Sequence, residues 1–274
     1  MKNAFCSIIA VFVVIGFLNG QTITSYKDKG GIMFEEFDTV PDQFAYSLDN
    51  VIYIPNKKFK CVYQYVKNGD NYCFQSTGEK NWKLIEKSLA TDSVAQTIVF
   101  EILNNTSMYP NLPLGNEGQS RLHFSYFNAM QRRLPIQEFT GLVENEKNIW
   151  MHPPREFLFQ VLELNPFPYI KFPVVKGRKW RWQLTIGPQW GNPLWKEWDG
   201  AIVNKYKYRI IDTDYKLQTA FGELSCAVVK AFARSRIGAT EATFFFHKTY
   251  GFVRFEYVNI DDSTIILDLI EVSE

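Results

Sequence analysis

Apolar and polar residues alternate along much of the C-terminal half of the chain. Residues 205–210 read Lys-Tyr-Lys-Tyr-Arg-Ile, and residues 180–185 read Trp-Arg-Trp-Gln-Leu-Thr. A period of two residues is that of a β-strand with one buried face. Further strands are predicted near 224–228, 252–257 and 265–269, and no helical pattern separates them. Closely spaced strands without intervening helices indicate an antiparallel sheet.

The N-terminal half shows shorter segments of the same kind. We expect strands at 32–37, 51–54 and 122–126, with turn residues between them. Residues 94–103 are mostly apolar, and their length does not distinguish a strand from a helix.

One segment has the pattern of a helix. Pro154 suits the first helical position. Apolar residues at positions 157, 158, 161 and 162 then fall on one face of the helix. Asn165 and Pro166 follow and are expected to end it.

These patterns together predict a mainly β protein. We expect a curved antiparallel sheet, in the form of a half-barrel or open barrel, with one short helix near residues 154–164. Residues 165–177 contain three prolines and one glycine and form a candidate boundary. One division places a β-rich half at 21–164 and an antiparallel half at 165–274. The alternative is one continuous domain over 21–274.

A hairpin is predicted around Asn68-Gly69, which favours a two-residue type I′ turn. This turn places Lys67 opposite Asp70. Cys61 and Cys73 would then lie about three residues out of step, roughly 10 Å along the ladder. A disulfide needs Cα atoms within about 7 Å. An oxidising compartment favours a disulfide between these two residues, whereas the simplest register opposes it.

The N-terminus has the order of a secretory signal peptide. Lys2 precedes an uncharged apolar run from Ala4 to Leu18, and polar sequence follows Gly20. We expect a signal peptide over 1–20 and export to the periplasm or the extracellular space. An uncleaved membrane anchor is the alternative, but the run is shorter than the ~20 apolar residues of a spanning helix.

The composition changes the picture in two ways. The chain has 30 Lys+Arg and 29 Asp+Glu, and residues 1–20 contain one lysine, so the mature chain carries 29 of each. A neutral chain has no general attraction to nucleic acid or anionic membranes. Aromatic residues make up 16% of the chain, which favours pleated, half-buried strands over disorder. An outer-membrane barrel fits less well, because charges occur on both strand parities.

The C-terminal part, from about Phe172 to Val272, resembles the TapB-like family of exported bacterial proteins with a domain of unknown function. Three segments carry the resemblance, at 172–180, 220–226 and 250–256. Phe252 stands where the family has leucine, and the tryptophan-rich stretch 190–198 is additional. The resemblance implies a curved antiparallel sheet with a hydrophobic concave face and no established catalytic residues.

No catalytic or metal-binding motif stands out. The three histidines, at 123, 152 and 247, have no ligand spacing to one another or to cysteine, so we expect no metal and no cofactor. The sequence has no nucleophile elbow, phosphate loop or dinucleotide fingerprint. Cys226 and His247 could form a thiolate pair. However, Cys226 alternates with apolar residues and is better explained as a buried thiol.

A tryptophan cluster is the most suggestive feature for binding. Trp190, Trp195 and Trp198 lie near a predicted turn, where exposed aromatic rings could contact a sugar or an apolar partner. We therefore name them as candidate ligand-binding residues. Packing of these rings against neighbouring prolines is the structural alternative.

The leading hypothesis is an exported, non-enzymatic envelope protein that binds an apolar ligand or a protein partner on a concave aromatic sheet face. One alternative is a carbohydrate-binding protein that uses the loop tryptophans, and another is a hydrolase with its site between the halves. The expected partners are a hydrophobic small molecule, a lipid or a glycan. No nucleic acid is expected, and no membrane span after cleavage.

Overall fold

The computed structural model describes residues 25–27, 33–35, 50–77, 81–91, 94–103 and 120–274. The predicted signal peptide lies outside these residues. No helix within the described ranges is long and apolar enough to span a membrane.

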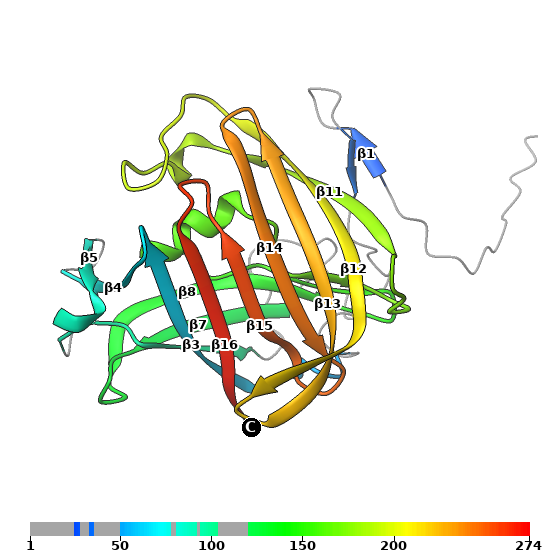
Figure 1. Ribbon diagram of the computed structural model, residues 1–274, viewed down its shortest axis with the longest axis horizontal. Helices are drawn as coiled ribbons and strands as arrows, with labels where there is room; N and C mark the ends of the chain where they lie inside the picture. Colours follow the sequence, from blue (N-terminus) through cyan, green and yellow to red (C-terminus); the bar gives the residue numbers. More distant parts are fainter. Residues whose placement is uncertain (1–24, 28–32, 36–49, 78–80, 92–93, 104–119) are drawn as a thin grey trace, which may run out of the picture.

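The described chain is mostly strand and forms one large antiparallel sheet, as the alternation predicts (Figure 1). Fourteen strands belong to it, and β1 (Ser25–Lys27) and β2 (Met33–Glu35) pair separately. The fourteen are β3 (Lys58–Lys67), β4 (Asp70–Ser76), β5 (Trp82–Glu86), β6 (Thr97–Ile102), β7 (Ser120–Phe127), β8 (Arg133–Glu144), β9 (Asn148–Met151), β10 (Tyr169–Lys171), β11 (Lys179–Ile186), β12 (Ile202–Thr219), β13 (Gly222–Ser235), β14 (Gly238–His247), β15 (Gly251–Val258) and β16 (Thr264–Ser273).

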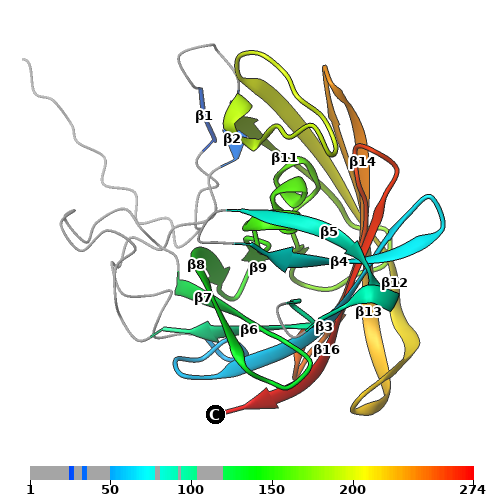
Figure 2. The ribbon, with the colours of Figure 1, turned by 90° about the vertical axis from the view of Figure 1, so that its left-hand side faces the viewer.

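The sheet is open but strongly curled (Figures 1 and 2). Its strand order is β10-β9-β8-β7-β6-β3-β16-β15-β14-β13-β12-β11, and β4 and β5 branch from β3. The two ends of the sheet, β9–β10 and β11, contact each other through aromatic side chains. Tyr169 of β10 lies 5.6 Å from Trp180 of β11 between ring centroids, and Trp150 of β9 lies 5.8 Å from Trp182. Strands from both predicted halves therefore share one core.

The predicted helix is present and fills the inside of this curl (Figure 2). It is a 3-10 helix, η2 (Phe157–Leu164), which begins three residues after Pro154. Two shorter 3-10 turns are η1 (Lys87–Leu89) and η3 (Pro188–Trp190). The sequence predicts one buried face, but every residue of η2 except Gln160 is buried. The sheet surrounds η2, so its polar side also faces protein.

The hairpin follows the predicted register. Lys67 pairs with Asp70, and the turn residues Asn68 and Gly69 have φ values of 54° and 90°. Positive φ at both positions is the requirement of a type I′ turn. Cys61 and Cys73 are both buried free thiols in this arrangement.

Residues 51–54 were expected as a strand, and here the prediction is wrong. The segment is a bend whose backbone is held by one side chain from the end of β8. The Glu144 carboxylate accepts hydrogen bonds from the backbone N–H groups of Val51, Ile52 and Tyr53, at 3.1, 2.9 and 2.9 Å. A carboxylate therefore replaces the neighbouring strand as acceptor, which the local sequence does not reveal.

Candidate functional site

The predicted tryptophan site is only partly exposed. Trp195 is buried, and its ring stacks on Trp82 of β5 with centroids 6.2 Å apart. Its indole Nε1–H donates to the carbonyl of Trp190 at 3.2 Å. Trp195 therefore closes the 190–198 loop onto β5.

Trp190 and Trp198 are half-buried. The Arg155 guanidinium lies 5.9 Å from the Trp190 ring centroid. The Trp198 indole nitrogen is buried without a hydrogen-bond partner among the described residues. Of the three predicted residues, these two keep part of their rings accessible.

The inner aromatic face of the sheet is occupied by the chain itself. Phe159 of η2 packs edge-on against Tyr63 and Phe74, at 5.3 and 5.8 Å, and lies 5.9 Å from Tyr126. A small apolar cavity between Cys61, Met151 and their neighbours has a volume of only about 10 Å³. A cavity of that size is at the limit for a single water molecule.

The histidines and thiols do not assemble a reactive centre within the described ranges. No group of three or more His, Cys, Asp or Glu there could hold a metal ion. His152 Nε2 lies 3.1 Å from the Glu163 carboxylate, and its Nδ1 lies 2.8 Å from the Pro153 carbonyl. This pair fastens η2 to the segment before it. Burial raises the pKa of the Cys226 thiol to about 11, which leaves it protonated and unreactive near neutral pH.

The most distinctive surface lies on the outer side of β11, β12 and β13. Their register aligns nine outward-facing positions into three rows, and seven of the nine are Lys or Arg. We call these nine positions the basic face. The rows are Lys179–Arg209–Lys230, Arg181–Lys207–Phe232 and Gln183–Lys205–Arg234.

Buried and exposed positions alternate along residues 204–211 of β12. On β12, Tyr206 and Tyr208 are buried, whereas Lys205, Lys207 and Arg209 between and beside them are exposed. The buried tyrosines stack on Trp182 and Trp180 of β11, with centroids 4.9 and 5.3 Å apart. These aromatic contacts set the pairing that brings the cations together.

The cations of the basic face have little internal compensation. Within the described ranges, only Lys230 forms an ion pair, with Glu241 of β14 at 3.9 Å. Four directly opposed pairs are cation against cation. Like charges opposite each other on neighbouring strands are destabilising. Two charges 5 Å apart repel by about 0.8 kcal/mol even in water. The arrangement therefore does not serve the stability of the sheet.

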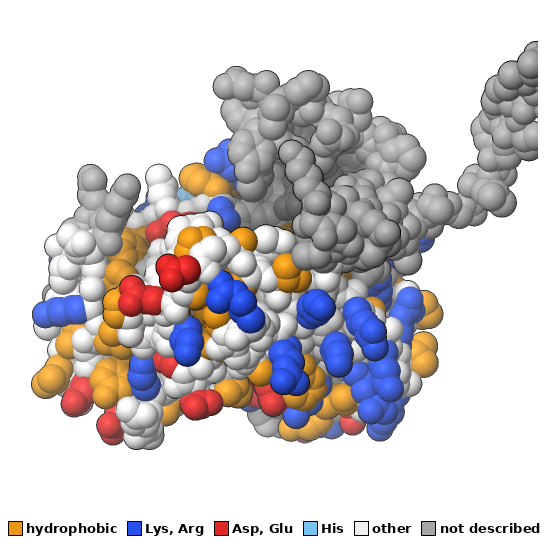
Figure 3. All heavy atoms as spheres, turned by 90° about the horizontal axis from the view of Figure 1, so that it is seen from above, with side chains coloured by type: hydrophobic (Ala, Val, Ile, Leu, Met, Phe, Trp, Pro, Cys, Tyr) orange, Lys and Arg blue, Asp and Glu red, His pale blue; other side chains and the backbone are white. Residues whose placement is uncertain are grey.

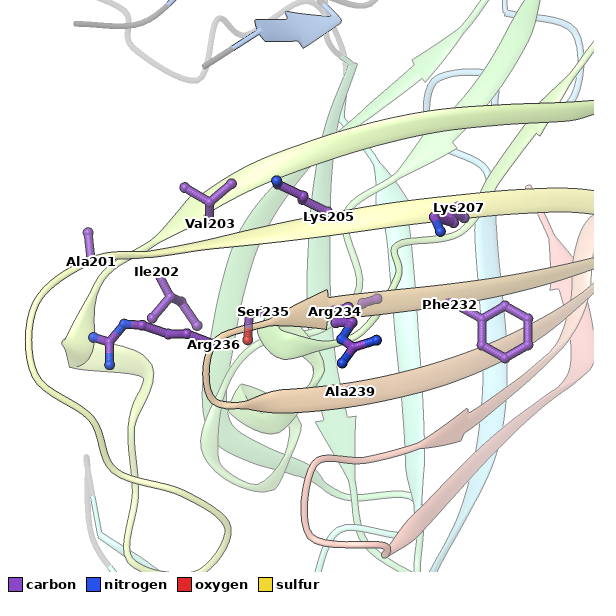
Figure 4. Close-up of a pocket in the computed structure, with 11 residues that line it drawn as sticks. Ala201, Ile202, Val203, Lys205, Lys207, Phe232, Arg234, Ser235, Arg236 and Ala239 are labelled. Atoms are coloured by element: carbon purple, nitrogen blue, oxygen red, sulfur yellow. The ribbon is translucent and has the colours of Figure 1, made fainter. Parts of the chain in front are cut away.

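Two hollows run along the basic face. The larger, of about 850 Å³, extends from Ala201 to Arg236 at the end of the β13 strand, and the smaller, of about 520 Å³, reaches Lys179 and Arg181. Lys207 and Phe232 line both. Figure 4 shows the lysines of β12 beside Phe232 and Arg234 of β13.

The distribution of charge is uneven across the surface seen in Figure 3. Lys and Arg side chains concentrate toward the right of this view, whereas side chains of both signs occur toward the left. The balanced total charge hides this asymmetry. The basic face was not predicted, although the sequence contains its signal: cations at every second position in the segments 179–181 and 205–209.

No protein-family model matches the chain, and no curated protein matches it. The comparison with solved structures finds matches at low identity and low TM-score. A solved structure of a predicted exported protein with a YmcC-like fold from Bacteroides fragilis is 11% identical, covers 82% of this chain and 100% of its own, and gives a TM-score of 0.42. A predicted lipoprotein from Parabacteroides distasonis is 11% identical, with 81% and 97% covered and a TM-score of 0.41. The hypothetical lipoprotein YmcC from Escherichia coli is 10% identical, with 86% and 91% covered and a TM-score of 0.34. The resemblance to the TapB-like family stays a prediction.

Proposed function

We propose that this chain is an exported binding protein whose basic face binds a polyanion. The observation that carries the proposal is the row register of β11–β13, which places seven cations in nine outward positions. Because their mutual repulsion weakens the fold, a ligand that neutralises them is the simplest reason for the arrangement. Two hollows on this face provide room for such a ligand.

Export rests on the pattern of residues 1–20, a charged start followed by an uncharged apolar run. Mass spectrometry of protein secreted from a bacterial host tests it. We expect a mature N-terminus at Gln21, and a retained Met1 in the exported fraction would contradict cleavage.

The binding proposal is tested by removing three neighbouring cations of β12. The triple variant Lys205→Gln, Lys207→Gln, Arg209→Gln should bind polyphosphate about 10- to 100-fold more weakly at low salt, since each contact contributes about 0.5–1 kcal/mol. The slope of log affinity against log salt should also become shallower, because fewer counterions are released.

A matched control loses the same charge elsewhere. Lys83, Lys87 and Arg132 are exposed and lie outside the basic face. Their triple glutamine variant should bind polyphosphate within about twofold of the unmodified protein. Equal losses in the two triple variants would show that net charge, not the basic face, governs binding and would contradict the proposal.

The earlier hypothesis of an apolar ligand on the concave face is less favoured, because η2 occupies that face. The tryptophan loop remains a second candidate surface for a glycan through Trp190 and Trp198, whose rings are partly accessible. Trp198→Ala should lower the affinity for a neutral oligosaccharide if this loop binds one. Under the polyanion proposal alone, the same variant leaves polyphosphate binding unchanged.

A further inference from the structure

We infer that the polyanion is an acidic polysaccharide, held by the cations at its charged groups and by Phe232 at the face of a sugar ring. This inference rests on the proposed polyanion-binding function and names the ligand class. It follows from the position of Phe232, the shape of the hollows and the ratio of aromatic residues to cations.

Phe232 is the one aromatic side chain among the nine positions of the basic face. It is 44% exposed and stands where the two hollows meet. Lys207 lies directly opposite on β12, and the Lys230 ammonium lies 5.5 Å from the ring centroid. A ring kept open to solvent amid cations suits a ligand that has both anionic groups and an apolar face.

The shape of the face favours a chain over a bilayer. The two hollows share Lys207 and Phe232 in their lining and together border β11, β12 and β13, so that a flexible polymer can follow both. Association by insertion into a bilayer instead buries a set of apolar side chains roughly 5–10 Å deep in the headgroup region. The basic face has one aromatic side chain, Phe232, among its nine positions.

The chemistry favours a polysaccharide over single-stranded nucleic acid. Sites for single strands provide a succession of aromatic side chains on which consecutive bases stack. The basic face offers one ring for seven cations. An acidic polysaccharide fits that ratio, because its charges repeat along the chain while an aromatic ring contacts only one sugar at a time. Three further lining residues of the larger hollow, Ala201, Ser235 and Ala239, are small and leave room for hydroxyl groups.

The variant Phe232→Ala removes the aromatic ring and leaves the seven cations in place. It therefore separates the contribution of the ring to binding from that of the charges. The probes are polygalacturonate, which has carboxylates and sugar rings, and polyphosphate, which has charge without rings. Loss of one aromatic contact worth about 1 kcal/mol should weaken polygalacturonate binding about fivefold. The loss should be similar at low and high salt, because the contact is uncharged. Polyphosphate affinity should not change.

Tyr215→Ala is the matched control. Like Phe232, Tyr215 is an exposed aromatic residue, 46% accessible. It lies on β12 and lines neither hollow. This variant should bind both probes like the unmodified protein. Circular dichroism and melting temperature establish that both variants are folded, which is expected because both side chains are exposed.

Two further probes decide between ligand classes. An oligothymidylate strand or a phosphatidylglycerol vesicle that binds more tightly than polygalacturonate of equal charge would overturn the polysaccharide inference and leave the polyanion function standing. An equal effect of Phe232→Ala on polygalacturonate and polyphosphate would overturn it as well. Failure of every anionic probe to bind would refute the polyanion function itself, and the inference with it.

Discussion

Two regions on the outer surface of the sheet differ in whether their cations are paired with acidic side chains. Over β3, β15 and β16, cations face acids. Arg254 forms a two-point contact with Asp268 directly opposite, at 2.6 and 3.1 Å, and Lys60 lies 3.6 Å from Glu271. We call this the paired face. Over β11–β13, cations face cations.

The contrast separates what the fold needs from what a ligand needs. Both regions belong to one sheet, and both lie on strands whose other side packs into the core. Sheet formation alone therefore does not require unpaired cations. The paired face shows how this chain neutralises surface charge, whereas the cations of the basic face are, apart from Lys230, without such partners among the described residues.

The largest effect is expected for Tyr208→Ala. This variant tests whether the buried side of β12 is sufficient to hold the strand in the sheet. Tyr208 is fully buried, stacks on Trp180 at 5.3 Å, and its hydroxyl donates to the Phe167 carbonyl at 3.1 Å. Tyr208→Ala should lower the free energy of unfolding by about 3–5 kcal/mol, as for other large-to-small core changes. Urea denaturation measures this. A loss below about 1 kcal/mol would show that the outer side also secures the strand.

The next effect concerns a third arrangement of an ionisable group, a buried carboxyl group that stays protonated. Glu138 of β8 accepts hydrogen bonds from the Tyr126 hydroxyl and the Arg155 backbone N–H, both at 2.9 Å. Burial raises the pKa of its carboxyl from 4.5 to about 8. The folded state therefore retains a proton that the unfolded state has released in this range.

The sign of the pH dependence follows directly. The stabilisation is complete below about pH 4.5 and is lost as the pH rises through about 8. Between pH 5 and pH 7, the free energy of unfolding should fall by about 2–3 kcal/mol relative to the Glu138→Gln variant, in which the group does not titrate. Denaturation curves of both proteins at the two pH values measure the difference. Parallel pH profiles would place the carboxyl pKa near its ordinary value.

Much of the fold could be predicted from local patterns. The alternation at 180–185 and 205–210 identified β11 and β12, and Asn68-Gly69 specified the hairpin and its register. The helix near 154–164 was found from one apolar face. Each of these depends on residues that are close in sequence, which is where period and turn chemistry carry information.

The basic face could not be found in the same way, because it depends on pairing. Alternation shows that Lys207 and Arg209 point away from the core. It does not show that Arg181 and Lys179 lie opposite them on the neighbouring strand. The occupied inner face was missed for a similar reason, since the position of η2 inside the curl is set by long-range packing around Phe159.

A smaller effect is expected when the paired face is broken. Asp268→Asn removes one charge from the contact with Arg254, in which both side chains are about one-third exposed. Partly exposed ion pairs contribute up to about 1 kcal/mol, and two-point Arg–carboxylate contacts are at the upper end. We expect a loss of about 0.5–1 kcal/mol in the free energy of unfolding at low salt. A double-mutant cycle with Arg254→Gln isolates the pair, and a coupling energy near zero would mean that the pairing is incidental.

The smallest effect has the opposite sign and separates the two faces most sharply. Lys207 lies opposite Arg181 and has no ion pair among the described residues, whereas Lys60 lies near Glu271. Lys207→Gln relieves repulsion and should raise the free energy of unfolding by a few tenths of a kcal/mol, at most about 0.8. Lys60→Gln should lower it by up to about 0.5 kcal/mol. Both changes should vanish in 1 M salt, where charges are screened beyond about 3 Å.

A substitution that stabilises the fold while weakening polyanion binding is the signature of a residue retained for its ligand. If Lys207→Gln destabilises the protein as Lys60→Gln does, the basic face is part of the structural framework and its functional assignment fails.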